Sequence, residues 1–92
     1  MDFHIKDVLK KYVKKNEIED GYYSQKISKY WMERMGKSIS QRTDRILYKN
    51  HELYVYVNSA PLKQELFNSR AKIMEIVNEY LEEELVKKVI VC

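Results

Sequence analysis

The chain has 92 residues, 45% of them hydrophobic, with two glycines, one proline and a formal net charge of +3. This composition excludes a disordered or low-complexity chain and predicts a single domain over residues 1–92 with one modest core. Residues 1–50 carry 12 basic and 7 acidic side chains (+5), and residues 51–92 carry 5 and 7 (−2), so the basic first half is compatible with a polyanionic partner.

Cysteine content and hydropathy predict where the protein resides. The one cysteine, Cys92, cannot form an internal disulfide, so the fold does not depend on an oxidising compartment. The first residues are charged and lack the apolar run of a signal peptide. No stretch approaches the ~20 apolar residues that a membrane span needs. We therefore expect a cytoplasmic protein with no membrane partner.

A helical N-terminal part is expected over residues 1–36. Its first helix covers residues 5–13, where Ile5, Val8, Leu9, Tyr12 and Val13 form one apolar stripe. The lysines of residues 10–15 are interpreted as a solvated face rather than a binding patch. The second helix covers about residues 18–35 and ends at Gly36 in a left-handed conformation.

One side chain of the second helix is expected to organise the core. Ile27, Tyr30, Trp31 and Met35 share one face of this helix. Trp31 is the largest apolar side chain of the sequence, and we interpret it as a core anchor rather than a platform for a ligand.

The remaining part, residues 37–92, is expected to begin with a β-hairpin. Its strands cover about residues 39–48 and 52–58, joined at Lys49-Asn50-His51, where Asn tolerates a positive φ. Period-two alternation places Leu53, Val55 and Val57 on one face of the second strand and Tyr54 and Tyr56 on the other. The aliphatic face should pack on helices and the tyrosine face should stay open.

A long helix and a last strand complete the expected fold. Ser59 can cap the helix, and Pro61 fits its first turn. The helix should reach about Glu82, and Asn68-Ser69 is a point where it can loosen or kink. Its apolar stripe consists of Leu62, Leu66, Ile73, Val77, Tyr80 and Leu81. A last strand over residues 85–91 is expected beside the first strand.

The resulting order, α-α-β-β-α-β, predicts an α+β fold with a three-stranded sheet and helices packed on one face. The turn after Tyr56 then folds the long helix over the aliphatic face and leaves the tyrosines uncovered.

No motif for catalysis or for a cofactor is found. Gly36-Lys37-Ser38 resembles the tail of a phosphate-binding P-loop, but Trp31 stands where the first glycine of the motif belongs, and the segment follows a helix. No set of residues has metal-ligand spacing or forms a recognisable nucleophile setting. We expect a protein that is not an enzyme and that binds no nucleotide, metal or other cofactor.

Basic residues flank the expected tyrosine face. Unpaired bases can stack on tyrosines while cations follow the phosphates, and the start of the long helix can hold one phosphate. The candidate nucleic-acid-binding residues are Lys37, Arg42, Arg45, Lys49, Tyr54, Tyr56 and Lys63. A protein–protein face is an equally good interpretation, because tyrosine and arginine are also enriched there.

Several stretches together resemble one family. Trp31-Met-Glu-Arg-Met-Gly36 looks like its Trp-x4-Gly signature, and Leu53-Tyr-Val-Tyr-Val57 looks like its Leu-x-Val-x-Val strand. Ser59-Ala-Pro-Leu-Lys-Gln-Glu-Leu66 is similar to its Ser/Pro turn leading to Glu-Leu in a long helix. The closing Val86-Lys-Lys-Val-Ile-Val91 resembles its last strand. In this order and spacing, the motifs resemble the DciA family over nearly the whole chain.

The resemblance implies a loader or operator of the bacterial replicative helicase that hydrolyses no ATP itself. It also implies nucleic-acid binding and a fold similar to type II KH modules, although the Gly-x-x-Gly loop of true KH domains is absent. We therefore expect a DNA-replication accessory protein that binds the replicative helicase and single-stranded DNA. The alternatives are a KH-like RNA-binding module and a pure protein-interaction domain.

Overall fold

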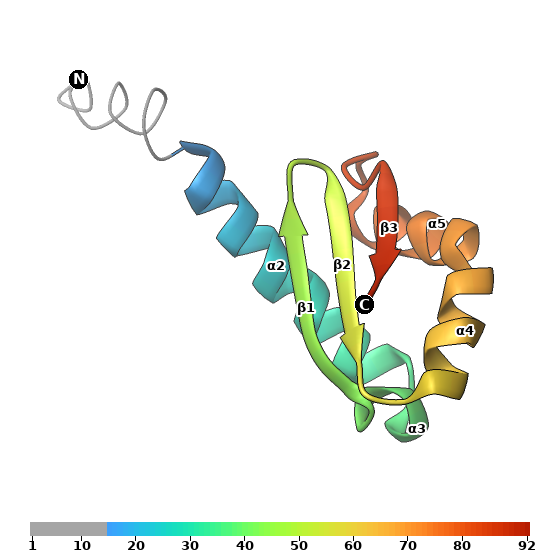
Figure 1. The fold of residues 1–92 in the computed structure, drawn as a ribbon. Coiled ribbons are helices and arrows are strands. Elements are labelled where there is room, and N and C mark those ends of the chain that lie inside the picture. The colour runs from blue at the N-terminus through green and yellow to red at the C-terminus, as the bar shows by residue number, and fades with distance from the viewer. Residues whose placement is uncertain (1–14) are drawn as a thin grey trace, which may run out of the picture.

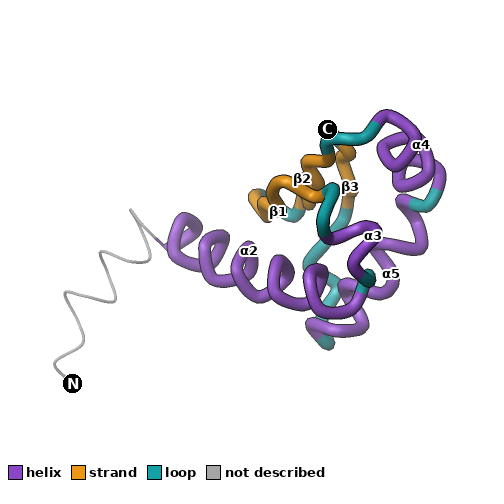
Figure 2. The backbone as a smooth tube through the Cα atoms, turned by 90° about the horizontal axis from the view of Figure 1, so that it is seen from below, coloured by secondary structure: helices purple, strands orange, loops and turns teal. Residues whose placement is uncertain are grey.

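The computed structural model describes residues 15–92, so the helix expected over residues 5–13 lies outside the described part. The described elements are α2 (Lys15–Arg34), α3 (Lys37–Ser40), β1 (Thr43–Lys49), β2 (Glu52–Val57), α4 (Ala60–Asn68), α5 (Arg70–Leu81) and β3 (Lys88–Val91). Figures 1 and 2 show α2 and α5 on one side of the three-stranded sheet and α4 beside β3. The expected α+β class is confirmed, with two helices more than predicted among the described residues, because α3 is added and the long helix is divided into α4 and α5.

The hairpin forms as the alternation predicts. Leu53 and Val55 are buried, and Tyr54 and Tyr56 are half-buried on the other face. The strands pair antiparallel with Ile46 opposite Val55. Asn50 and His51 have φ of 52° and 64°, as a two-residue type I′ turn requires.

Both outer strands are shorter than predicted. The first strand was expected from residue 39, but Lys37–Ser40 forms the short helix α3, in which the Ser40 amide donates to the Gly36 carbonyl. The last strand was expected from residue 85, but it begins at Lys88. The segment before β3 is held by the side chain of Asn78. This side chain accepts a hydrogen bond from the Val86 amide at 2.8 Å and donates one to the Val86 carbonyl at 2.9 Å.

The long helix is divided at Ser69 into α4 and α5, at the point where loosening was expected. Ser59 caps α4 by accepting a hydrogen bond from the Leu62 amide, and Pro61 lies in the first turn, as predicted. Tyr80 was placed in the buried stripe, and this was wrong. It is 36% exposed and stacks on Tyr30 of α2, with ring centroids 4.1 Å apart, because Val77 and Leu81 already occupy the inner face of α5.

The predicted position of the last strand was also wrong. β3 lies beside β2, parallel to it, and not beside β1. The free edge of β1 is already occupied by Ser24 of α2. The Ser24 hydroxyl accepts from the Tyr48 amide at 2.8 Å and donates to the Tyr48 carbonyl at 3.2 Å. These are the backbone groups that a further strand would need.

Trp31 anchors the core, as predicted, with none of its surface exposed. Its indole Nε1–H donates to Thr43 Oγ1 at 3.0 Å, and the Thr43 hydroxyl donates to the Ile39 carbonyl at 2.8 Å. Gly36, next to this site, has φ 85° and ψ 160°. The positive φ was expected, but the ψ is not that of a left-handed helical residue.

We predict that Thr43→Val destabilises the protein by about 1–3 kcal/mol, because it leaves the buried indole N–H of Trp31 without an acceptor. Urea unfolding followed by the fluorescence of Trp31 measures this loss. Thr43→Ser keeps the hydroxyl and should lose clearly less. Equal losses in the two variants would contradict the assigned role of the hydrogen bond.

Candidate nucleic-acid interface

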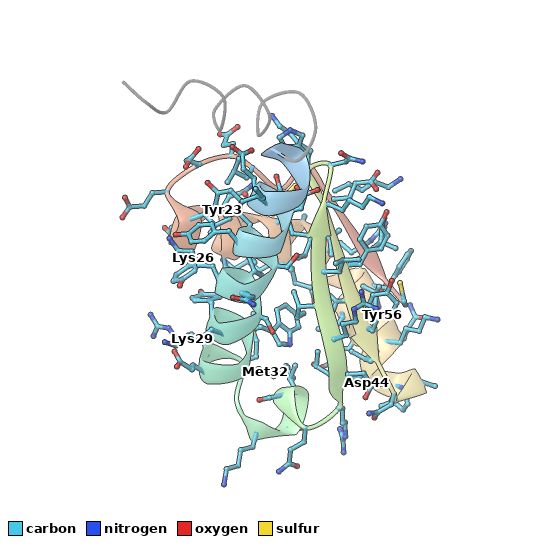
Figure 3. The ribbon with its side chains drawn as sticks, turned by 90° about the vertical axis from the view of Figure 1, so that its left-hand side faces the viewer. Tyr23, Lys26, Lys29, Met32, Asp44 and Tyr56 are labelled. Atoms are coloured by element: carbon cyan, nitrogen blue, oxygen red, sulfur yellow. The ribbon has the colours of Figure 1, made fainter. Side chains whose placement is uncertain are left out.

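The sheet face opposite α2 and α5, here called the open face, carries three rows of side chains across the strands. The rows are Arg45, Tyr56 and Cys92; Leu47, Tyr54 and Ile90; and Lys49, Glu52 and Lys88. They follow from the register, because paired residues of neighbouring strands point to the same face. Figure 3 shows Tyr56 on the side of the molecule away from Lys26 and Lys29 of α2.

A β-bulge aims Arg45 at this face. The pairing register shifts between Thr43 and Arg45, so Asp44 and Arg45 are both exposed while Thr43 and Ile46 on either side are buried. The Arg45 guanidinium lies over the Tyr56 ring, 5.5 Å from its centroid. Asp44 is turned to Asn58, whose side-chain amide donates to its carboxylate at 2.7 Å. The bulge thereby separates this acid from the cation beside it.

The electrostatics of the three rows favour an anion. Arg45, Lys49 and Lys88 contribute three positive charges and Glu52 one negative charge. In the described part of the chain, the only ion pair within 4 Å is Lys72–Glu75, on α5. Neither lysine beside Glu52 is therefore paired with it, and both ammonium groups can meet a phosphate.

Glu52 instead accepts a hydrogen bond from its neighbour on the same strand. The Tyr54 hydroxyl donates to Glu52 Oε1 at 2.6 Å. This hydrogen bond is the main cause that raises the pKa of Tyr54 above its ordinary value of 10.0, and desolvation adds to it. The phenol is therefore neutral at physiological pH, with its hydroxyl turned to the carboxylate.

The structure gathers four of the seven candidate residues on the open face: Arg45, Lys49, Tyr54 and Tyr56. Arg42 directly precedes β1, and its carbonyl accepts from the Asn58 amide at 2.9 Å. Lys63 lies in the first turn of α4, which follows Asn58. These two exposed cations belong to the end of the sheet nearest Arg45. Lys37 begins α3, which packs against α2, and is not part of the three rows.

Five residues of the open face were not among the candidates. Leu47 and Glu52 lie on the hairpin, and the other three, Lys88, Ile90 and Cys92, lie on β3 or directly after it. These three join it because β3 pairs with β2, with Lys88 opposite Glu52 and Ile90 opposite Tyr54. The sequence carried a usable signal, since a strand, a helical crossover and a second strand favour a parallel pair in one sheet.

Two other kinds of site are absent from residues 15–92. This part of the chain contains no group of three or more His, Cys, Asp and Glu side chains that could hold a metal ion. None of its helices is both long and apolar enough to cross a membrane.

Fold and open face together define a small α+β domain that offers a broad aromatic and basic surface to a partner. The chain belongs to the DciA family: the family model described as "Dna[CI] antecedent, DciA" matches residues 4–91. The resemblance drawn from the motifs is thereby confirmed. The family acts in DNA replication and helicase loading and is not a known family of enzymes. Comparisons with curated proteins and with solved structures gave no match.

We predict that Glu52→Gln lowers the pKa of Tyr54 toward its ordinary value, because the carboxylate that favours the protonated phenol is lost. The shift can be followed by NMR titration of tyrosines labelled at Cζ. In the native protein, the hydrogen bond from the neutral Tyr54 phenol to Glu52 stabilises the folded state. This stabilisation is fully present below pH 10 and is lost as the pH rises through the raised pKa of Tyr54 in the folded protein. Glu65→Gln, on α4, is the matched control. A Tyr54 pKa that does not respond to Glu52→Gln would contradict the assignment.

Proposed function

We propose that this protein is a non-enzymatic accessory protein of DNA replication that binds the replicative helicase and single-stranded DNA, with the DNA on the open face. The observation that carries the proposal is the alternation of aromatic and cationic side chains on this face. Membership of the DciA family supports the role in replication and helicase loading.

The middle row supplies the contacts for bases. Leu47, Tyr54 and Ile90 form an apolar band across all three strands, and every base offers a π-face to stack on such a surface. Base–aromatic stacking contributes about 1–3 kcal/mol per base and is tolerant of sequence. A loading factor needs this tolerance, because it acts on DNA of many sequences.

The two outer rows supply the contacts for phosphates. Arg45 lies at one end of the face, and Lys49 and Lys88 at the other. Arg42 and Lys63 extend the basic track beyond the Arg45 end. Lys37 contributes only to the long-range attraction of the strand, since it lies on α3.

Arg45 has two roles in this arrangement. Without DNA its guanidinium covers the Tyr56 ring, an interaction worth about 0.5–1 kcal/mol at an exposed site. A charge-assisted bond to a phosphate is stronger than this contact. DNA therefore draws Arg45 from the ring to the phosphate and exposes Tyr56 to a base.

We predict that the double variant Tyr54→Ala/Tyr56→Ala binds single-stranded DNA at least about tenfold more weakly, because two stacking contacts are lost. Fluorescence anisotropy with a labelled oligonucleotide measures the change, and circular dichroism verifies the fold. The matched control is Tyr22→Ala/Tyr80→Ala, which removes two exposed tyrosines from the helical side.

In the same titrations, Arg45→Gln should reduce the slope of log K against log salt by about 0.7.

Unchanged affinity in the Tyr54/Tyr56 variant would exclude the open face as the stacking surface. Competition between DNA and RNA strands of equal sequence decides the nature of the ligand, because only RNA offers the 2′-hydroxyl. A clear preference for RNA would favour the RNA-binding alternative.

We further predict a stable complex between this protein and the replicative helicase of the same organism, because helicase loading requires the two to meet. Size exclusion with light scattering, with and without a single-stranded oligonucleotide, measures its formation and mass. The helicase alone is the control for its own assembly. A fully assembled helicase that forms no complex in either condition would contradict this part of the proposal.

A further inference from the structure

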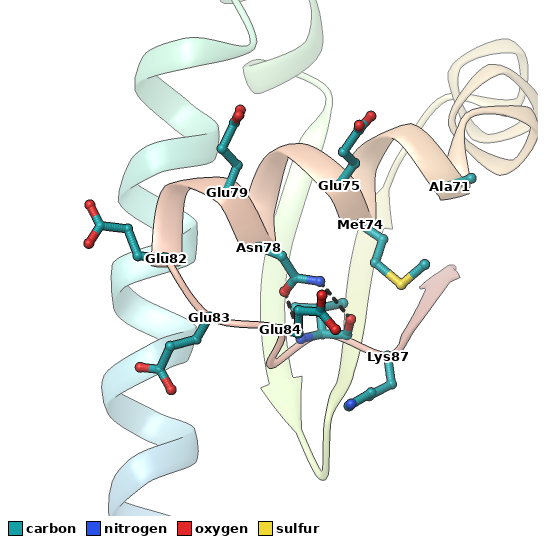
Figure 4. Close-up of a pocket in the computed structure, with 10 residues that line it drawn as sticks. Ala71, Met74, Glu75, Asn78, Glu79, Glu82, Glu83, Glu84 and Lys87 are labelled. Carbon is teal, nitrogen blue, oxygen red and sulfur yellow. Dashed lines mark hydrogen bonds between the residues drawn. The ribbon is translucent and has the colours of Figure 1, made fainter.

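A groove of about 710 Å³ lies between α5 and the segment that leads into β3 (Figure 4). None of the residues that line it belongs to the three rows of the open face. Its lining is mostly acidic at the rim, with Glu75, Glu79, Glu82, Glu83 and Glu84 against the single cation Lys87. Together these six side chains carry a net charge of −4. The groove therefore repels a nucleic acid and attracts a basic ligand.

The floor of the groove is apolar. Ala71, Met74 and Val86 contribute to it. Figure 4 shows Met74 and Asn78 turned toward the segment that carries Glu84 and Lys87. The Asn78 side chain is already engaged with both backbone groups of Val86. The groove thus offers apolar contact in its floor and negative charge at its rim, but few polar groups for a small hydrophilic ligand.

The acidic rim carries an electrostatic cost in the isolated domain. Glu79, Glu82 and Glu83 lie at the C-terminal end of α5, where the helix dipole disfavours anions. Glu75 has Lys72 as an ion-pair partner at 3.2 Å, and no other rim carboxylate has one among the described residues. A cationic ligand would relieve both the mutual repulsion and the unfavourable interaction with the dipole.

The sequence itself contains a segment of matching chemistry. Residues 8–14, VLKKYVK, contain three lysines and no acid, and four of their seven residues are apolar. At helical spacing, Val8, Leu9, Tyr12 and Val13 form one stripe with the lysines beside it. Such a segment matches an apolar floor with an acidic rim.

We propose that residues 8–14 of one chain occupy the acidic groove of a second copy, and that the exchange is reciprocal. Residues 8–15 contain no glycine, proline, asparagine or aspartate, so this stretch has no residue suited to a tight reversal before α2. This favours the groove of another copy over that of the same chain. Reciprocal exchange fills two equivalent grooves and gives a closed two-fold dimer.

Self-association should be weak and sensitive to salt. A standard stable interface buries about 800 Å² per partner, and one short segment in one groove provides less than this. The exchange supplies the contact twice, and exposed charge pairs supply much of the attraction. Sedimentation of the full chain at increasing concentration should show a monomer–dimer equilibrium at about 0.05 M salt that is lost at about 0.5 M.

The decisive experiment uses two complementary charge reversals in the full chain. Glu79→Lys/Glu83→Lys raises the net charge of the groove from −4 to 0, and Lys10→Glu/Lys11→Glu changes that of residues 8–14 from +3 to −1. Each variant alone should dimerise at least about tenfold more weakly than the native chain. Mixed in equal amounts, they should form a heterodimer, because the basic segment of the groove variant then meets the unaltered acidic groove of the segment variant.

The control Glu33→Lys/Glu65→Lys makes the same change of net charge at exposed sites outside the groove and should dimerise like the native chain. Circular dichroism verifies that all variants are folded. Two results overturn the proposal: a native chain that is monomeric at every concentration in low salt, or reversed variants that remain monomeric when mixed. Neither result depends on DNA or helicase binding, so the proposed function is tested separately.

Discussion

The two hydrogen bonds between the Ser24 hydroxyl and the Tyr48 backbone determine much of this architecture. They fix α2 along the outer edge of β1 and satisfy the Tyr48 amide and carbonyl, which another strand on this edge would need. The last strand is then left with the other edge of the hairpin, where it pairs with β2. That pairing brings Lys88 and Ile90 beside Glu52 and Tyr54. One serine on a helix thus contributes to the composition of a surface on the opposite side of the sheet.

The sheet also separates two surfaces of opposite charge. The open face carries three cations and one carboxylate in its rows, whereas the groove along α5 carries five carboxylates and one lysine. Within one domain such charges would largely cancel if they were neighbours. The core around Trp31, Leu53 and Val77 lies between them. Each surface can therefore select its own partner, a polyanion on one side and a basic segment on the other.

Local patterns in the sequence predicted the parts of the fold that depend on neighbouring residues. Alternation in β2 identified the tyrosine face, and Ser59 with Pro61 identified the start of α4. The incorrect predictions concern features of the fold that tertiary contacts determine. Residues 39 and 40 were placed in the first strand but belong to the helical turn α3, and nothing local shows which edge of a hairpin a distant strand will join. Lys88 was missed as a site residue for this reason, since its place on the open face depends on the edge that β3 joins.

The order of the rows on the open face bears on how it would hold a strand. Arg45 and Lys49 are four residues apart on one strand, a separation of about 13 Å, with the apolar row between them. A bound strand can therefore place phosphates at both ends and bases in the middle, and this does not require reading any base edge. The negative charge of Glu52 is opposite to what a phosphate-binding site needs. Its bond to the Tyr54 hydroxyl at 2.6 Å accounts for its presence, because it orients the ring in the middle row, while Lys49 and Lys88 on either side more than offset its charge. A carboxylate in this position thus acts on the stacking surface without reversing the sign of the field that attracts the phosphates.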